Sequence, residues 1–131
     1  MWEISMKTVL LLDDARAIRS VYAEVIRQAG FEAYTASSAE EGLQHIIEHG
    51  APDLIVTDIN MPGVDGIAFC QHLRNLTKHT PIVVMSAYSD KSQVLEARSL
   101  GIMRWILKPV EPEYFLNTLR AVLGEPQTLS I

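Results

Sequence analysis

Short apolar segments alternate with amphipathic helical patterns along the chain, and this alternation constrains the fold more than any other feature. Each strand-length segment is rich in aliphatic and β-branched residues. The segments are residues 7–12, 31–36, 53–57, 82–86 and 102–108. A helical spacing of apolar residues follows every one of them. Strict alternation of this kind predicts a parallel sheet that is covered by helices on both faces.

The polarity of each segment predicts its place in the sheet. Residues 8–12, 54–57 and 82–85 are apolar or β-branched throughout, as is typical of central strands that are buried on both faces. The segments FEAYTA and RWILK contain polar residues, so we expect them at the edges. The fold class is therefore α/β, a doubly wound sandwich around a five-stranded parallel sheet. Helical spacing also places Ile47 and Leu76 on the buried faces of their helices.

The length and charge of the chain limit the classes of protein that it fits. A single domain of 131 residues can bury about two-thirds of its unfolded surface, so it needs no disulfide or metal to stabilise a core. The net charge of −5, with scattered basic residues, argues against direct nucleic-acid binding. No apolar run approaches the roughly 20 residues that cross a membrane, and one cysteine fits a reducing compartment. We expect one cytoplasmic domain, 1–131, with a core at 7–124, a leader at 1–6 and a tail at 125–131.

The stretch LIVTDINMPGVDG, residues 54–66, places a carboxylate at the end of a buried strand. Asp58 follows the strand directly. Pro62 and Gly63 suit the two central positions of a type II turn, and Asp65 suits the N-cap of the next helix. Open α/β sheets bind their ligands at the carboxyl ends of the strands, so Asp58 becomes the first candidate site residue.

Four further polar residues are expected at the same edge of the sheet, because they follow other strands: Asp13, Asp14, Ser86 and Lys108. Three converging carboxylates repel one another unless a cation lies among them. Oxygen ligands without cysteine or histidine suit Mg²⁺, while the lysine and the serine hydroxyl suit a phosphoryl group. The set predicts a phosphoryl-transfer site. For any one of these residues, an ordinary polar strand end is the alternative.

The chain resembles the receiver domain of two-component response regulators over residues 7–124. The motifs that carry the resemblance are LLLDD at 10–14, TDINMPGVDG at 57–66, VMSA at 84–87 and WILKP at 105–109. The resemblance implies a flavodoxin-like (βα)₅ fold with strand order 2-1-3-4-5. It implies that Asp58 accepts a phosphoryl group from the phosphohistidine of a sensor histidine kinase or phosphotransfer protein.

The same resemblance implies a ligand set for Mg²⁺, for which Mn²⁺ could substitute. Asp13, Asp14 (partly through water), Asp58 and the backbone carbonyl of Asn60 would hold the ion. The protein would then be a phosphoacceptor that assists its own phosphorylation and dephosphorylation, and not an enzyme in the usual sense.

Further roles follow from the resemblance for residues around the phosphoryl group. Ser86 and Lys108 would contact its oxygens, and the Lys108–Pro109 peptide bond would be cis. The switch of the family pairs a hydroxyl residue with an aromatic residue, which are Ser86 and Trp105 here. Tyrosine or phenylalanine is more usual at the second position. Trp105 therefore has two interpretations, an inward-turning switch residue or a surface aromatic at a partner interface.

Asn60 and Tyr88 flank the path of an attacking water in this resemblance and are predicted to tune the lifetime of the phosphoryl group. The output surface would be the fourth helix, fifth strand and fifth helix, where a downstream protein or a second copy could bind. The chain could also be a piece of a longer regulator or hybrid kinase.

Three other classes are weighed against this prediction. A phosphatase of the haloacid-dehalogenase type needs an acid two residues after its nucleophile, where this chain has Asn60. A flavodoxin-like cofactor site needs a loop that accepts phosphate after the first strand, and Asp13-Asp14 would repel it. A receiver-like module that is never phosphorylated need not retain all five polar residues. His45 and His49 have a metal-binding spacing, but a solvated helix face is the preferred interpretation.

Overall fold

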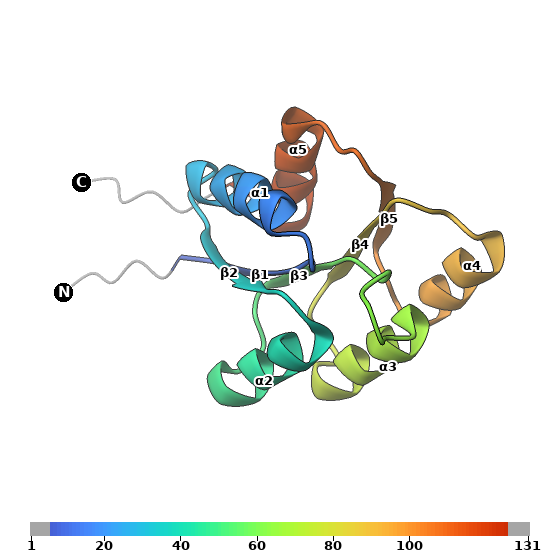
Figure 1. The fold of residues 1–131 in the computed structure, drawn as a ribbon. Helices are drawn as coiled ribbons and strands as arrows, with labels where there is room; N and C mark the ends of the chain where they lie inside the picture. Colours follow the sequence, from blue (N-terminus) through green and yellow to red (C-terminus); the bar gives the residue numbers. More distant parts are fainter. Residues whose placement is uncertain (1–5, 126–131) are drawn as a thin grey trace, which may run out of the picture.

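In the computed structural model, which describes residues 6–125, parallel strands form one sheet in the order β2-β1-β3-β4-β5 (Figure 1). The strands are β1 (Thr8–Leu12), β2 (Glu32–Ala36), β3 (Leu54–Thr57), β4 (Ile82–Ser86) and β5 (Arg104–Leu107). The helices are α1 (Arg16–Gln28), α2 (Ala39–His49), α3 (Gly66–Leu76), α4 (Lys91–Ser99) and α5 (Pro112–Leu123). The fold class and strand order predicted above are confirmed. Residues 1–5, which include Trp2, and 126–131 lie outside the described residues, so the expected leader and tail stay predictions.

Two layers of helices enclose the sheet. Figure 1 shows α1 and α5 on one face and α2, α3 and α4 on the other. Alternate residues of β1 pack against the two helix layers, with Val9 and Leu11 in one hydrophobic cluster and Leu10 and Leu12 in the other. All four side chains are fully buried, which confirms the central position of this strand.

The register of the strands brings their carboxyl ends level. Leu12 of β1 pairs with Ala36 of β2 and with Thr57 of β3, and Ser86 of β4 pairs with Leu107 of β5. The residue that follows each strand therefore emerges at one edge of the sheet. This register, more than any single loop, determines which side chains can meet there.

The turn between β3 and α3 has the predicted form. The Val64 N–H donates to the Met61 carbonyl at 3.3 Å, and Gly63 between them has φ +73°. The Asp65 carboxylate then accepts from the N–H groups of the first turn of α3, at 3.1 and 3.2 Å. The turn and the N-cap are confirmed, and together they fix the wall beside Asp58.

Two side chains expected in the core point to solvent instead. Ile47 of α2 is 64% exposed and Leu76 of α3 is 44% exposed. In α2 the buried positions are Ala39, Gly42 and Ile46, a narrow stripe that leaves Ile47 about 100° away from Ile46 around the helix axis. The prediction for Ile47 was wrong because a small residue, Gly42, lets α2 lie close to β1.

Arg74 of α3 joins the ends of two helices. Its guanidinium donates to the carbonyls of Leu100 and Thr80 at 2.9 Å, and to those of Thr77 and Gly101 at 3.2 Å. Carbonyls at a helix C-terminus lack partners within the helix, so a single arginine here satisfies several of them.

Arg74→Met is expected to lower the free energy of unfolding by about 2 kcal/mol, because charged hydrogen bonds to backbone carbonyls are lost. Chemical denaturation followed by circular dichroism measures the change. Arg98→Met, an exposed arginine on α4, is the matched control and should change stability little. Equal losses in the two variants would contradict the role given to Arg74.

Within residues 6–125, no helix combines the length and apolar character needed to cross a membrane.

Candidate functional site

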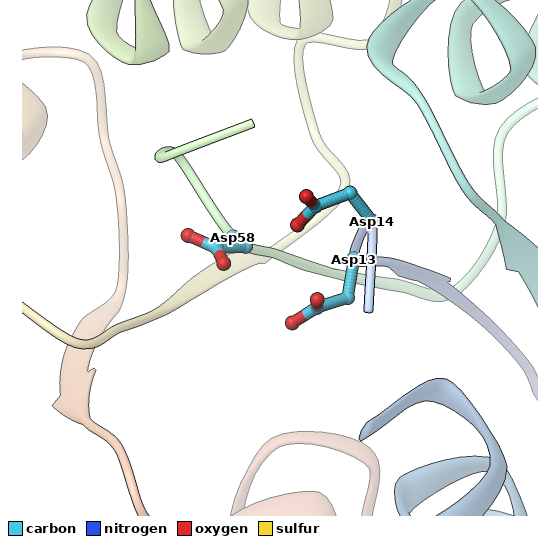
Figure 2. A group of neighbouring side chains, drawn as sticks. All are labelled: Asp13, Asp14 and Asp58. Atoms are coloured by element: carbon cyan, nitrogen blue, oxygen red, sulfur yellow. The ribbon is translucent and has the colours of Figure 1, made fainter. Parts of the chain in front are cut away.

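Three carboxylates meet at the carboxyl edge of the sheet. Asp13 and Asp14 follow β1 and Asp58 follows β3, and Figure 2 shows the Asp13 and Asp14 side chains extending toward the side on which Asp58 lies. One oxygen of each lies within 4.8 Å of the others. Asp13 is 1% and Asp58 8% exposed, whereas Asp14 is exposed to solvent. The site is thus half-open, with two of its acids shielded from water.

Lys108, directly after β5, is the cation of the site. Its ammonium forms ion pairs with the Asp13 carboxylate and, at 2.9 Å, with Oδ2 of Asp58. Burial alone would lower the pKa of Lys108, but the hydrogen bonds and negative charges of the two aspartates outweigh it and raise that pKa above its ordinary value. The lysine is therefore fully charged at neutral pH. The Lys108–Pro109 peptide bond is cis.

Backbone groups hold the two buried carboxylates in place. Oδ1 of Asp13 accepts from the Ala15 N–H at 2.9 Å, and the Asp13 carbonyl accepts from the Arg19 guanidinium at 2.7 Å. Oδ1 of Asp58 accepts from the Asn60 N–H at 2.8 Å. Each carboxylate thus bonds to the loop that follows it and to Lys108, which fixes the orientation of its oxygens.

Ser86, at the end of β4, is fully buried and bonded to residues of two loops. Its Oγ accepts from the Asn60 side-chain amide at 2.6 Å and from the Tyr88 N–H at 3.2 Å. Nothing in the sequence pattern predicted the Asn60 contact, because residue spacing does not say which loop side chains meet. The Tyr88 side chain is 69% exposed. Trp105 is half-buried, and its indole N–H donates to the Tyr88 carbonyl at 3.1 Å.

The donor set fits a hard divalent cation. Three carboxylates face one ammonium, which leaves the site with an excess of negative charge. Mg²⁺ prefers oxygen ligands and is bound through one or two carboxylates and water. Asp13, Asp14 and Asp58 could supply these ligands without moving any buried strand.

The His45–His49 pair does not have the geometry of a second metal site. The two rings stack with centroids 4.5 Å apart and planes 20° apart. Nearly parallel rings do not direct their nitrogens at one common ion. Burial, followed by the neighbouring His49, lowers the pKa of His45. The preferred interpretation, a helix surface without a ligand, remains the simpler one.

Residues 9–120 match the family model of the response regulator receiver domain. The chain belongs to this family. It is 34% identical over 118 residues to the transcriptional regulatory protein AfsQ1 of Streptomyces coelicolor, a match that covers 90% of this chain and 52% of that protein. The receiver domain thus spans about half the length of the curated transcriptional regulators it matches. It is also 25% identical over 115 residues to the sporulation initiation phosphotransferase F of Bacillus subtilis, with 88% of this chain and 92% of that protein covered.

Solved structures show the same fold. The chemotaxis protein CheY4 of Vibrio cholerae superimposes with a TM-score of 0.83 at 32% identity, covering 91% of this receiver domain and all of that chain. The response regulator TrrA of Thermotoga maritima, solved in complex with Mg²⁺ and beryllium fluoride, gives a TM-score of 0.79 at 28% identity. That match covers 90% of this domain and all of that chain.

Proposed function

We propose that this receiver domain accepts a phosphoryl group on Asp58 from the phosphohistidine of a sensor histidine kinase or phosphotransfer protein. One observation carries the proposal: the Asp58 carboxylate lies between a backbone N–H on Oδ1 and the Lys108 ammonium on Oδ2, with two more carboxylates beside it. A carboxylate held in this way is oriented for attack. The neighbouring charges suit a transferring phosphoryl group.

The residues present account for each part of the transfer. A carboxylate oxygen of Asp58 forms a bond to phosphorus while the phosphorus–nitrogen bond of the donor breaks, and the imidazole leaves with that electron pair. Lys108 stabilises the charge on the phosphoryl oxygens, and the Ser86 hydroxyl donates to one of them.

The acidic residues of the site would hold the ion that this reaction needs. Asp13, Asp14, Asp58 and the Asn60 carbonyl would hold Mg²⁺, which would supply positive charge to neutralise the phosphoryl oxygens. The Mg²⁺ in the TrrA structure supports this choice of ion. Replacement by Mn²⁺ stays a prediction.

Asp58→Asn is expected to abolish phosphoryl uptake, because the amide cannot form the acyl phosphate. Intact mass spectrometry after incubation with acetyl phosphate and Mg²⁺ measures the adduct. Asp65→Asn is the matched control, since asparagine also caps a helix, and should label like the wild type. If the wild-type protein gained no phosphoryl group under these conditions, the proposed function would be wrong.

Tyr88→Ala is expected to shorten the lifetime of the phosphoryl group by a few fold, if the tyrosine ring lies across the path of the attacking water, as the role proposed for it requires. The decay of the adduct mass after removal of the donor gives the rate. Tyr114→Ala, an exposed tyrosine on α5, controls for loss of an aromatic side chain. A decay equal to or slower than that of the wild type would contradict the prediction.

Phosphorylation would act through the surface of α4, β5 and α5. A hollow of about 450 Å³ lies on the β5–α5 part of this surface between Trp105 and Tyr114, and Leu107 in its lining is 53% exposed. A downstream protein or a second copy of the chain is the proposed partner, without direct nucleic-acid contact. The domain would act as a phosphoacceptor, and the cytoplasmic location expected from the sequence stays a prediction.

A second candidate is that this chain is the receiver part of a longer regulator or hybrid kinase, as the partial coverage of AfsQ1 suggests. The phosphatase alternative is not favoured, because Asn60 has no acidic proton and its amide is bonded to Ser86.

A further inference from the structure

The hydroxyl of Tyr22, on α1, bonds to both backbone groups of Val110 in the loop between β5 and α5. It donates to the Val110 carbonyl at 2.8 Å and accepts from the Val110 N–H at 3.2 Å. Both residues are only 7% exposed. Buried backbone groups require hydrogen-bond partners, and one side chain from a distant part of the sequence supplies them here. We call these two bonds the Tyr22 clamp.

The packing of the Tyr22 ring holds its hydroxyl in this place. The ring meets that of Phe115 edge to face, with centroids 4.9 Å apart and planes 71° apart. Both rings belong to the hydrophobic cluster on the side of the sheet that α1 and α5 cover (Figure 1). A tyrosine side chain has only two rotatable bonds, so a packed ring determines where its hydroxyl can reach.

The Tyr22 clamp anchors the backbone that carries Lys108. On one side, the Lys108 N–H donates to the Ser86 carbonyl at 2.8 Å, just beyond the last register pair of β4 and β5. On the other side, Pro109 has no N–H, so Val110 offers the first backbone donor after the lysine. Lys108 therefore lies between two anchors, and its backbone cannot shift far without breaking one of them.

The segments that the clamp joins are tied a second time at the site. Asp13, three residues before the start of α1, forms an ion pair with Lys108. Arg19 of α1 donates to the Asp13 carbonyl at 2.7 Å, so the helix is also fixed to the backbone of this acid. Two ties between the same two segments restrict both their separation and their relative orientation. Tyr22 thus helps to set where the Lys108 ammonium lies relative to the acids.

A firm backbone matters for this lysine because its four-carbon stem is flexible. In the resting protein, the carboxylates of Asp13 and Asp58 also hold the ammonium. A phosphoryl group on Asp58 would draw the ammonium to its own oxygens. The position of the charge would then depend more on the two backbone anchors, of which the Tyr22 clamp is one.

We propose that Tyr22 is a positioning residue for phosphoryl transfer, because its clamp on Val110 keeps the Lys108 ammonium facing the transferring group. Tyr22 acts through the backbone of the loop and not by contact with the phosphoryl group. Its effect on transfer rests on the proposed function, whereas the clamp exists in the resting protein.

Hydrogen exchange of the Val110 amide, followed by NMR, tests the clamp without a phosphodonor. Tyr22→Phe removes the hydroxyl and keeps the ring, so the Val110 amide should exchange roughly tenfold faster. Thr118→Val is the matched control, because it removes a buried hydroxyl that is bonded within α5 at 3.0 Å, and it should leave this rate unchanged. Equal Val110 exchange in Tyr22→Phe and in the wild type would overturn the clamp.

Adduct formation with acetyl phosphate and Mg²⁺, measured by intact mass, tests the effect on transfer. Tyr22→Phe is expected to slow uptake roughly tenfold, because small displacements of a group that faces the reacting atoms are costly. Thr118→Val should label at the wild-type rate. Tyr22→Leu is a second variant, which removes the hydroxyl together with the ring. Either Tyr22 variant, if folded by circular dichroism and labelled at the wild-type rate, would overturn the positioning role.

A double-mutant cycle with Lys108→Met separates positioning of the ammonium from a general loss of stability. Since Tyr22 acts through Lys108, Tyr22→Phe should change the already slow uptake of Lys108→Met by less than about twofold. An equal loss in both backgrounds would overturn the proposal, because Tyr22 would then act elsewhere. Absence of an adduct on the wild type would overturn the proposed function, while Val110 exchange would still decide whether the clamp exists.

Discussion

Replacing Lys108 with methionine is expected to lower the free energy of unfolding by about 3 kcal/mol, because two buried carboxylates lose the cation that pairs with them. Asp13 and Asp58 are 1% and 8% exposed, so water cannot fully solvate their negative charges once the lysine is removed. The same change should slow phosphoryl uptake roughly 100-fold, since a preorganised positive charge no longer faces the transferring group. The effect is large because one side chain serves both the fold and the proposed chemistry.

Denaturant unfolding in the presence of a chelator measures the stability of Lys108→Met, and adduct formation measures its uptake. Lys78→Met, an exposed lysine, is the matched control. Added Mg²⁺ should recover part of the lost stability by replacing the missing positive charge. A loss no greater than that of Lys78→Met would show that the ion pairs contribute little.

The difference in unfolding free energy between the wild type and Lys108→Met depends on pH, because the pKa of Lys108 is raised in the folded protein. A raised pKa means that the stabilisation is fully present below the unfolded value of about 10.4 and is lost as the pH rises through the higher folded value. The advantage of the wild type over Lys108→Met should therefore persist at neutral pH and shrink above about pH 10.

Gly66→Ala is expected to destabilise the protein by about 3 kcal/mol, because the added methyl group would clash with backbone atoms that cannot move without distorting the loop. A Cβ at this position would lie 2.4 Å from both the carbonyl oxygen and the Cβ of Ile59. Ile59 follows Asp58 directly, so relief of the clash would displace the proposed phosphoacceptor. Both the unfolding free energy and the rate of phosphoryl uptake should fall.

Gly42→Ala is the matched control for a glycine in a close helix contact. The added Cβ would lie closer to its neighbour, 2.1 Å from Cδ2 of Leu12, but that atom ends a side chain that can rotate. Alanine also favours the helix interior by about 1 kcal/mol over glycine. In denaturant unfolding, Gly42→Ala should therefore lower the free energy of unfolding less than Gly66→Ala does. The reverse order would contradict this prediction.

Local patterns were sufficient for the elements and for the turn beside the site. The apolar runs and their flanking glycines determine the strands and helices, since these depend on residues that are near in sequence. Pro62, Gly63 and Asp65 predicted the turn and the cap for the same reason. Ile47 shows where this reasoning fails, because burial on a helix depends on how closely the helix approaches the sheet.

The sequence by itself determined that Asp13, Asp14, Asp58 and Lys108 reach one edge, because every strand of a parallel sheet ends on the same side. Only the tertiary structure decided which of these groups pair, through the register of β1, β3 and β5. The tertiary structure also decided two hydrogen bonds, one from the Asn60 side-chain amide to Ser86 and one from the Trp105 indole to the Tyr88 carbonyl. Such contacts depend on ångström-scale distances between loops that are far apart in the chain, and residue spacing carries no information about those distances.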